Sequence, residues 1–128
     1  MDPILRTAVI IVHAALLSYT VGVVLEQRSR RASRAVVSWL TVGVVCDVVA
    51  TLGMIFGSTR GLLTLHGVLG YSALLGMTVD TARIWRHRLA HGDEIVPRGL
   101  HLFSRFAYLW WVVAYVTGAA LVALERSR

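Results

Sequence analysis

Hydrophobic residues follow one another in four long runs, which short polar segments separate. The runs cover residues 4–25, 35–57, 61–82 and 102–124, and each is close to the roughly 20 residues that an α-helix needs to cross a bilayer. Residues 57–61 are predicted to form a tight turn, and residues 83–101 a longer polar connection. Because short connections make neighbouring helices antiparallel, the pattern predicts an all-α, up-down-up-down four-helix bundle in the membrane, with residues 1–128 as one transmembrane domain.

Composition agrees with a membrane location and narrows the chemistry. Hydrophobic residues make up 56% of the chain, charged residues 16%, and the mean hydropathy is +0.67, which is high for a soluble domain. All 13 basic residues are arginine, and the formal net charge is +6. The arginines form clusters between the hydrophobic runs rather than one basic face, which argues against nucleic-acid binding. Cys46 is the single cysteine, which excludes a disulfide within the chain, a thiolate zinc site and haem attachment through paired cysteines.

The positions of the arginines predict the orientation in the membrane. Short cytoplasmic loops carry an excess of basic residues. The first and third connections are therefore predicted to face the cytoplasm, and both termini the outside of a bacterial cytoplasmic membrane. The nine arginines at these two connections are Arg28, Arg30, Arg31, Arg34, Arg83, Arg86, Arg88, Arg98 and Arg105, and the four on the other side are Arg6, Arg60, Arg126 and Arg128.

Polar residues at membrane depth are costly and mark candidate sites. In the third run, residues at helical spacing form one continuous stripe, which consists of His66, Gly70, Ala73, Met77 and Asp80. In the fourth run, a polar and aromatic face consists of His101, Ser104, Tyr108, Trp111, Tyr115 and Gly118. The second run contributes Gly43, Asp47, Thr51 and Met54, and the first contributes His13 and Thr20. These faces are predicted to meet inside the bundle.

Two of the histidines indicate a candidate haem site. In an up-down-up-down bundle the first and third helices are diagonal, so His13 and His66 approach a flat ligand from opposite sides, as two imidazoles do in b-type haem sites. In the alternative interpretation, each histidine only hydrogen-bonds to a nearby backbone carbonyl or hydroxyl group. Asp47 is predicted to pair with His13, Thr51 or a hydroxyl group rather than bind a metal. The methionines and the aromatic face are equally compatible with simple packing.

Five segments, SYTVGVVLE, WLTVGVVCDVVAT, LHGVLGYSALLGM, GLHLFSRF and WWVVAYVTG, occur in this order along the chain. Together they resemble the HsmA-type haem-sensing membrane protein family, and the resemblance covers nearly the whole chain. It implies binding of haem b within the membrane for haem tolerance and oxidative-stress defence, through sequestration or electron transfer rather than a known catalytic turnover. The matching positions are Tyr19, Glu26, Asp47, His66, Gly67, Gly70, Met77, His101, Trp111 and Thr117.

Two positions depart from this family's pattern. The family commonly has histidine at the position of Asp80, and His13 is not one of its shared residues. A pair of histidines 14 residues apart on one helix resembles the arrangement that holds two haems in membrane b-type cytochromes, and Asp80 interrupts this pair. We therefore expect at most one tightly bound haem, in the outer half of the bundle. The candidate cofactor-binding residues are, in order, His66, His101 and His13, with Gly70, Met77 and Tyr115 around them.

Asp80 is expected to have a different role. It lies near the cytoplasmic end of the third run, on the same side as His101 and Arg105. The guanidinium group of Arg105 is predicted to pair bidentately with the Asp80 carboxylate, and His101 to add a hydrogen bond.

Two other functions fit the same residues. In a small proton-linked transporter, Asp47, Asp80 and His66 relay protons, whereas in an accessory subunit of a larger membrane complex they hold a partner helix. Gly53 and Gly57 form a GxxxG pair, which predicts a homo-oligomer or docking onto such a complex. A bundle without any ligand is the third interpretation. Only the haem protein requires visible absorption, so a spectrum of the purified protein separates it from the others.

Overall fold

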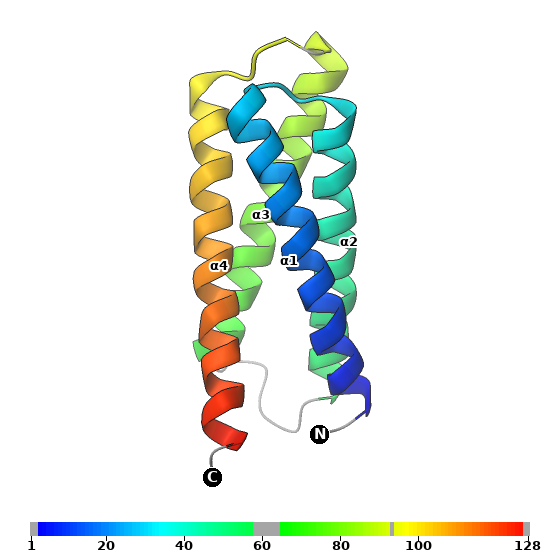
Figure 1. Ribbon diagram of the computed structural model, residues 1–128, viewed down its shortest axis with the longest axis vertical. Helices are drawn as coiled ribbons and strands as arrows, with labels where there is room; N and C mark the ends of the chain where they lie inside the picture. Colours follow the sequence, from blue (N-terminus) through cyan, green and yellow to red (C-terminus); the bar gives the residue numbers. More distant parts are fainter. Residues whose placement is uncertain (1–2, 58–64, 93, 127–128) are drawn as a thin grey trace.

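The computed structural model describes the backbone of residues 3–57, 65–92 and 94–126, and the side chains of these residues except 5, 54–57, 65, 66 and 121–126. Within these ranges it contains four α-helices (Figure 1): α1 (Pro3–Ser29), α2 (Arg34–Gly57), α3 (Leu65–His91) and α4 (Arg98–Arg126). Consecutive helices run in opposite directions, and the described residues form no strand. The predicted all-α, up-down-up-down four-helix bundle is confirmed.

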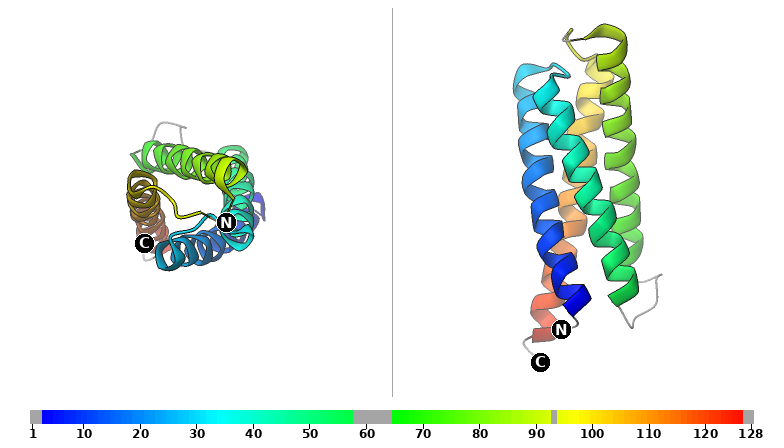
Figure 2. Two further views of the ribbon diagram at one scale, coloured as in Figure 1. Left: turned by 90° about the horizontal axis from the view of Figure 1, so that it is seen from above. Right: turned by 90° about the vertical axis from the view of Figure 1, so that its right-hand side faces the viewer.

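The helices follow one another around the bundle, as the view from above shows (Figure 2). α1 packs against α2 and α4, and α3 packs against the same two helices. Among the described residues, no Cα atom of α1 lies within 8 Å of one in α3, and the same holds for α2 and α4. α1 and α3 therefore face each other across the interior, as predicted.

α1 and α2 pack most closely, because glycines at their interface leave room for the neighbouring helix. A Cβ atom at Gly22 would lie 3.0 Å from the side chain of Leu40, and one at Gly53 would lie 3.0 Å from Cβ of Ala8. Small residues at an interface let two helix backbones approach and gain van der Waals contact. Gly53 thus serves a contact within the chain. Gly57, the other half of the predicted GxxxG surface, lies outside the described side chains.

The connection between α3 and α4 covers residues 92–97 only. The prediction of a polar connection over residues 83–101 is wrong, because arginine is a good helix former and its polarity does not end a helix. α3 stops before Gly92, whose φ of 63° and N–H bond to the Arg88 carbonyl oxygen (2.7 Å) form a left-handed C-cap. His87 and His91 therefore lie on α3 and not in a loop.

The α1–α2 and α3–α4 connections lie at the same end of the bundle and contact each other (Figure 1). The N–H group of Val96 donates to the carbonyl oxygen of Arg30 (2.7 Å), and Arg31 forms an isolated antiparallel bridge with Ile95. These bonds join the two helical hairpins at one end.

The outside of this bundle is rich in apolar side chains, and its mainly hydrophobic core also encloses several polar ones. Large apolar side chains are exposed on all of the described helices, and examples are Leu17, Val45, Leu75 and Val113. The buried polar side chains are Ser18, Glu26, Asp47, Asp80, Thr81, His101 and Ser104. Two helical segments, Arg6–Ser29 and Arg34–Gly53, are long and apolar enough to span a membrane. The membrane location of all four runs stays a prediction.

Candidate functional site

The predicted inner faces of α3 and α4 lie inside the bundle at their buried members, whereas Gly70 and Tyr115 are half-buried and the side chain of His66 lies outside the described residues. Met77 and Asp80 on α3 are 0% exposed, and His101, Ser104 and Trp111 on α4 are buried with them. The helical spacing of the sequence therefore predicted the rotation of both helices correctly. The polar atoms on these faces form three groups at successive levels of the bundle.

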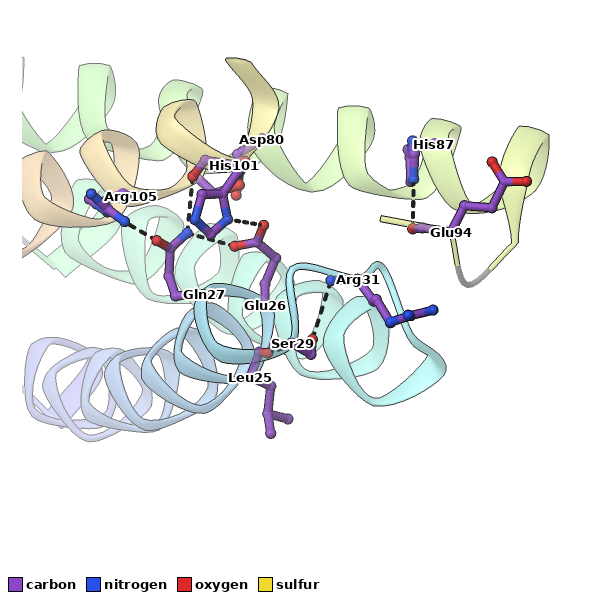
Figure 3. A network of polar contacts seen from close by, with 11 residues as sticks. Leu25, Glu26, Gln27, Ser29, Arg31, Asp80, His87, Glu94, His101 and Arg105 are labelled. Carbon is purple, nitrogen blue, oxygen red and sulfur yellow. Dashed lines mark hydrogen bonds and ion pairs between the residues drawn. The ribbon is translucent and has the colours of Figure 1, made fainter. Parts of the chain in front are cut away.

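Glu26 and His101 form the first group, which joins α1 to α4 (Figure 3). Glu26 Oε1 lies 2.9 Å from His101 Nδ1, and the two side chains are 1% and 9% exposed. Because an ionised carboxylate has no proton to donate, Nδ1 carries the hydrogen of this bond, and Nε2 is left for another partner. Gln27 Nε2 donates to Glu26 Oε2 (2.6 Å) and to the carbonyl oxygen of His101 (3.0 Å). Both carboxylate oxygens thus accept hydrogen bonds.

Arg105 does not pair with Asp80, so that prediction is wrong. Arg105 Nε donates to Gln27 Oε1 (3.0 Å) on the outside of the bundle, as Figure 3 shows. Its neighbour Ser104 donates to Asp80 Oδ1 instead. Successive residues of an α-helix are about 100° apart, so Ser104 faces the interior, where Asp80 lies, while Arg105 is exposed. The imidazole of His101 is likewise bonded to Glu26 and not to Asp80.

Asp80 keeps one carboxyl oxygen without a hydrogen bond. Among the described residues, its Oδ2 atom is buried and has no partner, and the same holds for Oγ1 of the neighbouring Thr81. A buried polar atom that lacks a partner costs about 1–3 kcal/mol. The second group, Asp80 with Ser104 and Thr81, is therefore the least satisfied part of the described polar core.

Asp47 forms the third group and joins α1, α2 and α4. Its Oδ2 atom accepts hydrogen bonds from Tyr19 Oη (3.0 Å) and from Trp111 Nε1 (2.8 Å), all in the buried core. Hydrogen bonds to an ionised acceptor are stronger than those between neutral groups. Of the partners predicted for Asp47, a hydroxyl group is confirmed. The described contacts of Asp47 include neither His13 nor Thr51.

An aromatic run continues from Trp111 toward the end of the bundle that holds the termini. The Trp111 and Tyr115 rings are stacked with centroids 5.8 Å apart, and the His13 ring meets Tyr115 edge-on at 5.6 Å. His13 Nδ1 lies 2.6 Å from the carbonyl oxygen of Val9. Because a carbonyl only accepts, Nδ1 carries the proton, and the lone pair of the neutral ring is on Nε2. His13 thus has the tautomer that an Nε2 metal ligand requires.

The register of the helices places His13 at the level of the first turn of α3. Tyr115 on α4 contacts His13, and Trp110, five residues earlier, donates through Nε1 to Ser72 Oγ on α3 (2.9 Å). Antiparallel helices rise equally per residue, so Tyr115 is level with about residue 67 of α3. His66 lies within one residue of this level on the helix diagonal to α1, although its side chain lies outside the described residues.

The described residues at this level combine an exposed histidine, His13, with a half-buried aromatic ring, Tyr115. A Cβ atom at Gly70 would meet no atom within 4 Å, so there is open space on the stripe that continues to the buried Ala73. His13 offers an imidazole nitrogen and Tyr115 an aromatic wall. Met77 lies deeper, as a fully buried member of the hydrophobic core.

His101 belongs to a separate level of the bundle. It is held by Glu26, which lies 13 residues after His13 on α1, or about 20 Å along the helix axis. One haem therefore does not contact both histidines. Among the described side chains, no group of three or more histidine, cysteine, aspartate or glutamate residues is placed to hold a metal ion.

Sequence reasoning from spacing alone missed Glu26 and Gln27. Glu26 entered only through the family resemblance, and Gln27 and Thr81 did not enter at all. A usable signal was present, because Glu26 lies seven residues after Tyr19, which is about two helical turns and therefore the same face of α1. For Gln27 the sequence contains no comparable signal, since its bonds depend on where α4 lies.

Comparison with known proteins identifies no relative: no protein-family model, curated protein or solved structure matches this chain. The resemblance to the HsmA-type family stays a prediction from the five segments.

Proposed function

We propose that this chain is an integral membrane protein that binds one haem b between α1 and α3, with His13 and His66 as axial ligands. The observation that carries the proposal is the register, which sets these two histidines at one level on diagonal helices. A packing distance of 8–10 Å between neighbouring helix axes gives a diagonal of about 11–14 Å. A Cβ atom at Gly70 on α3 would meet no atom within 4 Å, and the Tyr115 ring contacts the His13 ring edge-on.

The apolar outer surface of the bundle supports the membrane location. Phe106, Leu75 and Leu17 are each more than 60% exposed, and in water such side chains would lose the free energy gained by burial, about 1.5–3 kcal/mol each. In hydrocarbon the same surface is favourable, while the carboxyl groups of Asp47 and Asp80 remain enclosed by other helices. The nine-to-four arginine asymmetry supports an orientation with both termini outside.

Haem supplies a one-electron redox centre, or is simply stored, when it is bound in such a site. The chain's own residues bind and orient it: the Val9 carbonyl fixes the ring of His13, and Trp111 supports Tyr115 from the core. These properties are those of a protein that sequesters haem or passes electrons, in keeping with a role in haem tolerance and oxidative-stress defence.

The test is the haem content of the protein purified from its membrane fraction in mild detergent. The pyridine haemochrome assay, with protein quantification, is expected to give one haem b per chain and a Soret band typical of two imidazole ligands. His66→Ala and His13→Ala should each lose the wild-type spectrum and most of the haem. His87→Ala is the matched control, since His87 lies at the other end of α3 and its variant should keep haem.

Gel filtration and far-UV circular dichroism of each variant establish that the fold is intact. Folded His66→Ala and His13→Ala proteins that retain the wild-type haem content and spectrum would overturn the proposed ligands. Wild-type protein that binds two haems per chain, or that binds none when haem is supplied during expression, would overturn the proposed stoichiometry or the function itself.

A second candidate function is a proton-linked transporter or accessory subunit without haem. The observation in its favour is the Asp80 carboxyl group, which is fully buried and has an oxygen atom without a partner among the described residues. This function predicts that Asp80→Asn abolishes proton uptake by proteoliposomes that contain the purified protein. The haem proposal predicts that Asp80→Asn leaves haem content and spectrum unchanged.

A further inference from the structure

A basic groove lies between α3 and α4 at the end of the bundle where the two connections meet. Its volume is about 470 Å³. One wall is the last two turns of α3, and the other is Pro97 with Gly99 and Leu100 of the first turn of α4, whose N–H groups have no partner within the helix. Neither the described lining nor this first turn contains an acidic side chain. The charged or titratable lining residues are Arg83, Arg86, His87 and His91 of α3.

Contacts around the groove show which of these residues carry its charge. The Arg83 guanidinium carbon lies 5.0 Å from the centroid of the Phe103 ring, a cation–π contact that keeps Arg83 between the two helices. His87 Nε2 donates to the backbone oxygen of Glu94 (3.1 Å; Figure 3). His91 Nδ1 lies 3.5 Å from Glu94 Oε2 at the exposed rim, so Glu94 offsets charge on His91. The permanent positive charge of the groove therefore comes from its arginines.

The seam between α3 and α4 continues from this groove as an apolar surface. Its exposed apolar residues include Val79 on α3 and Phe106 and Trp110 on α4. The hydrogen bond from Trp110 to Ser72 joins the two helices farther from the groove. An inorganic anion would need the groove only. A molecule with an anionic group and acyl chains would use both the groove and the seam.

We propose that the groove binds the phosphate of an anionic phospholipid headgroup, with the acyl chains along the α3–α4 seam. Arginine forms bidentate hydrogen bonds to phosphate, and basic pockets between membrane helices on the cytoplasmic side recognise such headgroups. The inference rests on the membrane location in the proposed function but not on haem. Arg86 lies 20 residues after His66 on α3, about 30 Å along the axis, which is out of reach of haem propionates.

The experiment measures lipid binding by the full chain in detergent, with native mass spectrometry and thermal unfolding as readouts. Phosphatidylglycerol is expected to remain bound and to raise the unfolding temperature, whereas phosphatidylcholine is not. The double variant Arg83→Gln, Arg86→Gln should weaken phosphatidylglycerol binding by about tenfold to thirtyfold, since each basic residue contributes about 1 kcal/mol. Arg28→Gln, Arg34→Gln removes the same charge at the same end outside the groove and should bind normally.

Three results would overturn the proposal. Equal loss of binding in both double variants would mean that net charge, and not the groove, attracts the lipid. Stabilisation by inorganic phosphate to the same extent as by phosphatidylglycerol would identify a free-phosphate site. Wild-type protein that shows no preference for phosphatidylglycerol would exclude the site altogether. Recovery of the protein in the soluble fraction after carbonate extraction would instead refute the membrane location, which keeps the two failures distinct.

Discussion

Replacing Gly43 by alanine tests whether the hydrogen bonds of Asp47 hold α1, α2 and α4 together. A Cβ atom at this position would lie 2.6 Å from Cε1 and 3.0 Å from Cγ of the Tyr19 ring, which is closer than carbon atoms pack. The ring is 0% exposed and its hydroxyl donates to Asp47. Tyr19 therefore has no free space to turn into, and it either shifts α1 away from α2 or gives up its hydrogen bond.

The expected loss of stability follows from these contacts. Overpacking of a filled core costs about 1–3 kcal/mol, and a lost hydrogen bond to a charged group costs about 1.5–3 kcal/mol. Alanine returns about 1 kcal/mol through its higher helix propensity. These two costs do not add in full, because a ring that gives up its hydrogen bond also relieves the clash. We therefore expect Gly43→Ala to lower the free energy of unfolding by about 2–4 kcal/mol.

Unfolding in mixed micelles with increasing sodium dodecyl sulfate, followed by tryptophan fluorescence and circular dichroism, measures this difference. The matched control is Gly76→Ala, because the nearest atom to a Cβ there is Ala107 Cβ at an ordinary 3.9 Å. The control should be unchanged or more stable by up to about 1 kcal/mol. The reasoning is refuted if Gly43→Ala unfolds at the wild-type detergent concentration, or if both variants lose stability equally.

Three further predictions use the same protein. Ser104→Ala leaves the Asp80 carboxyl group without its hydrogen-bond donor and should lower the free energy of unfolding by about 1–3 kcal/mol; wild-type stability in the detergent titration would contradict this. Thr81→Val replaces a buried hydroxyl that lacks a described partner and should raise that free energy by about 1 kcal/mol; a destabilised variant would reveal a partner for the hydroxyl. In a background without the native cysteine, a cysteine introduced at Ser127 should react with an impermeant reagent on intact cells, and one introduced at Ser33 should not. The reason is that nine arginines flank the connections on the side of Ser33. The opposite labelling would show that the orientation is inverted.

The interior faces of the helices were predictable because burial follows the helical period. His101, Ser104 and Trp111 are spaced by three and seven residues, which is about one and two helical turns, and all are buried. A period fixes which way a residue points in its own helix. It does not fix which residue of another helix lies opposite. The partners of Asp80 and Asp47 were therefore missed or only partly predicted.

The error at Asp80 shows this limit. Charge complementarity favoured Arg105, and both residues are near the same end of the bundle. Ser104 and Arg105 are adjacent on α4, so their side chains point in directions about 100° apart. The rotation of α4 turns Ser104, and not Arg105, toward Asp80. The end of α3 was misplaced for another reason: a drop in hydropathy after residue 82 marks a change of surroundings, whereas the helix itself ends where Gly92 adopts a positive φ.

The hydrogen bonds of the core have a consequence for how the protein is made. Each buried carboxyl group takes a donor from α4: Glu26 from His101, Asp47 from Trp111 and Asp80 from Ser104. α4 is the last helix in the chain. In a nascent chain that contains only α1 to α3, the three carboxyl groups therefore lack these hydrogen-bond donors. Unpaired acids inside a membrane are unfavourable, and they distinguish an unfinished chain from a complete one. In the proposed membrane location, the three acids therefore gain their hydrogen-bond partners from α4 only after the last helix has packed against the others.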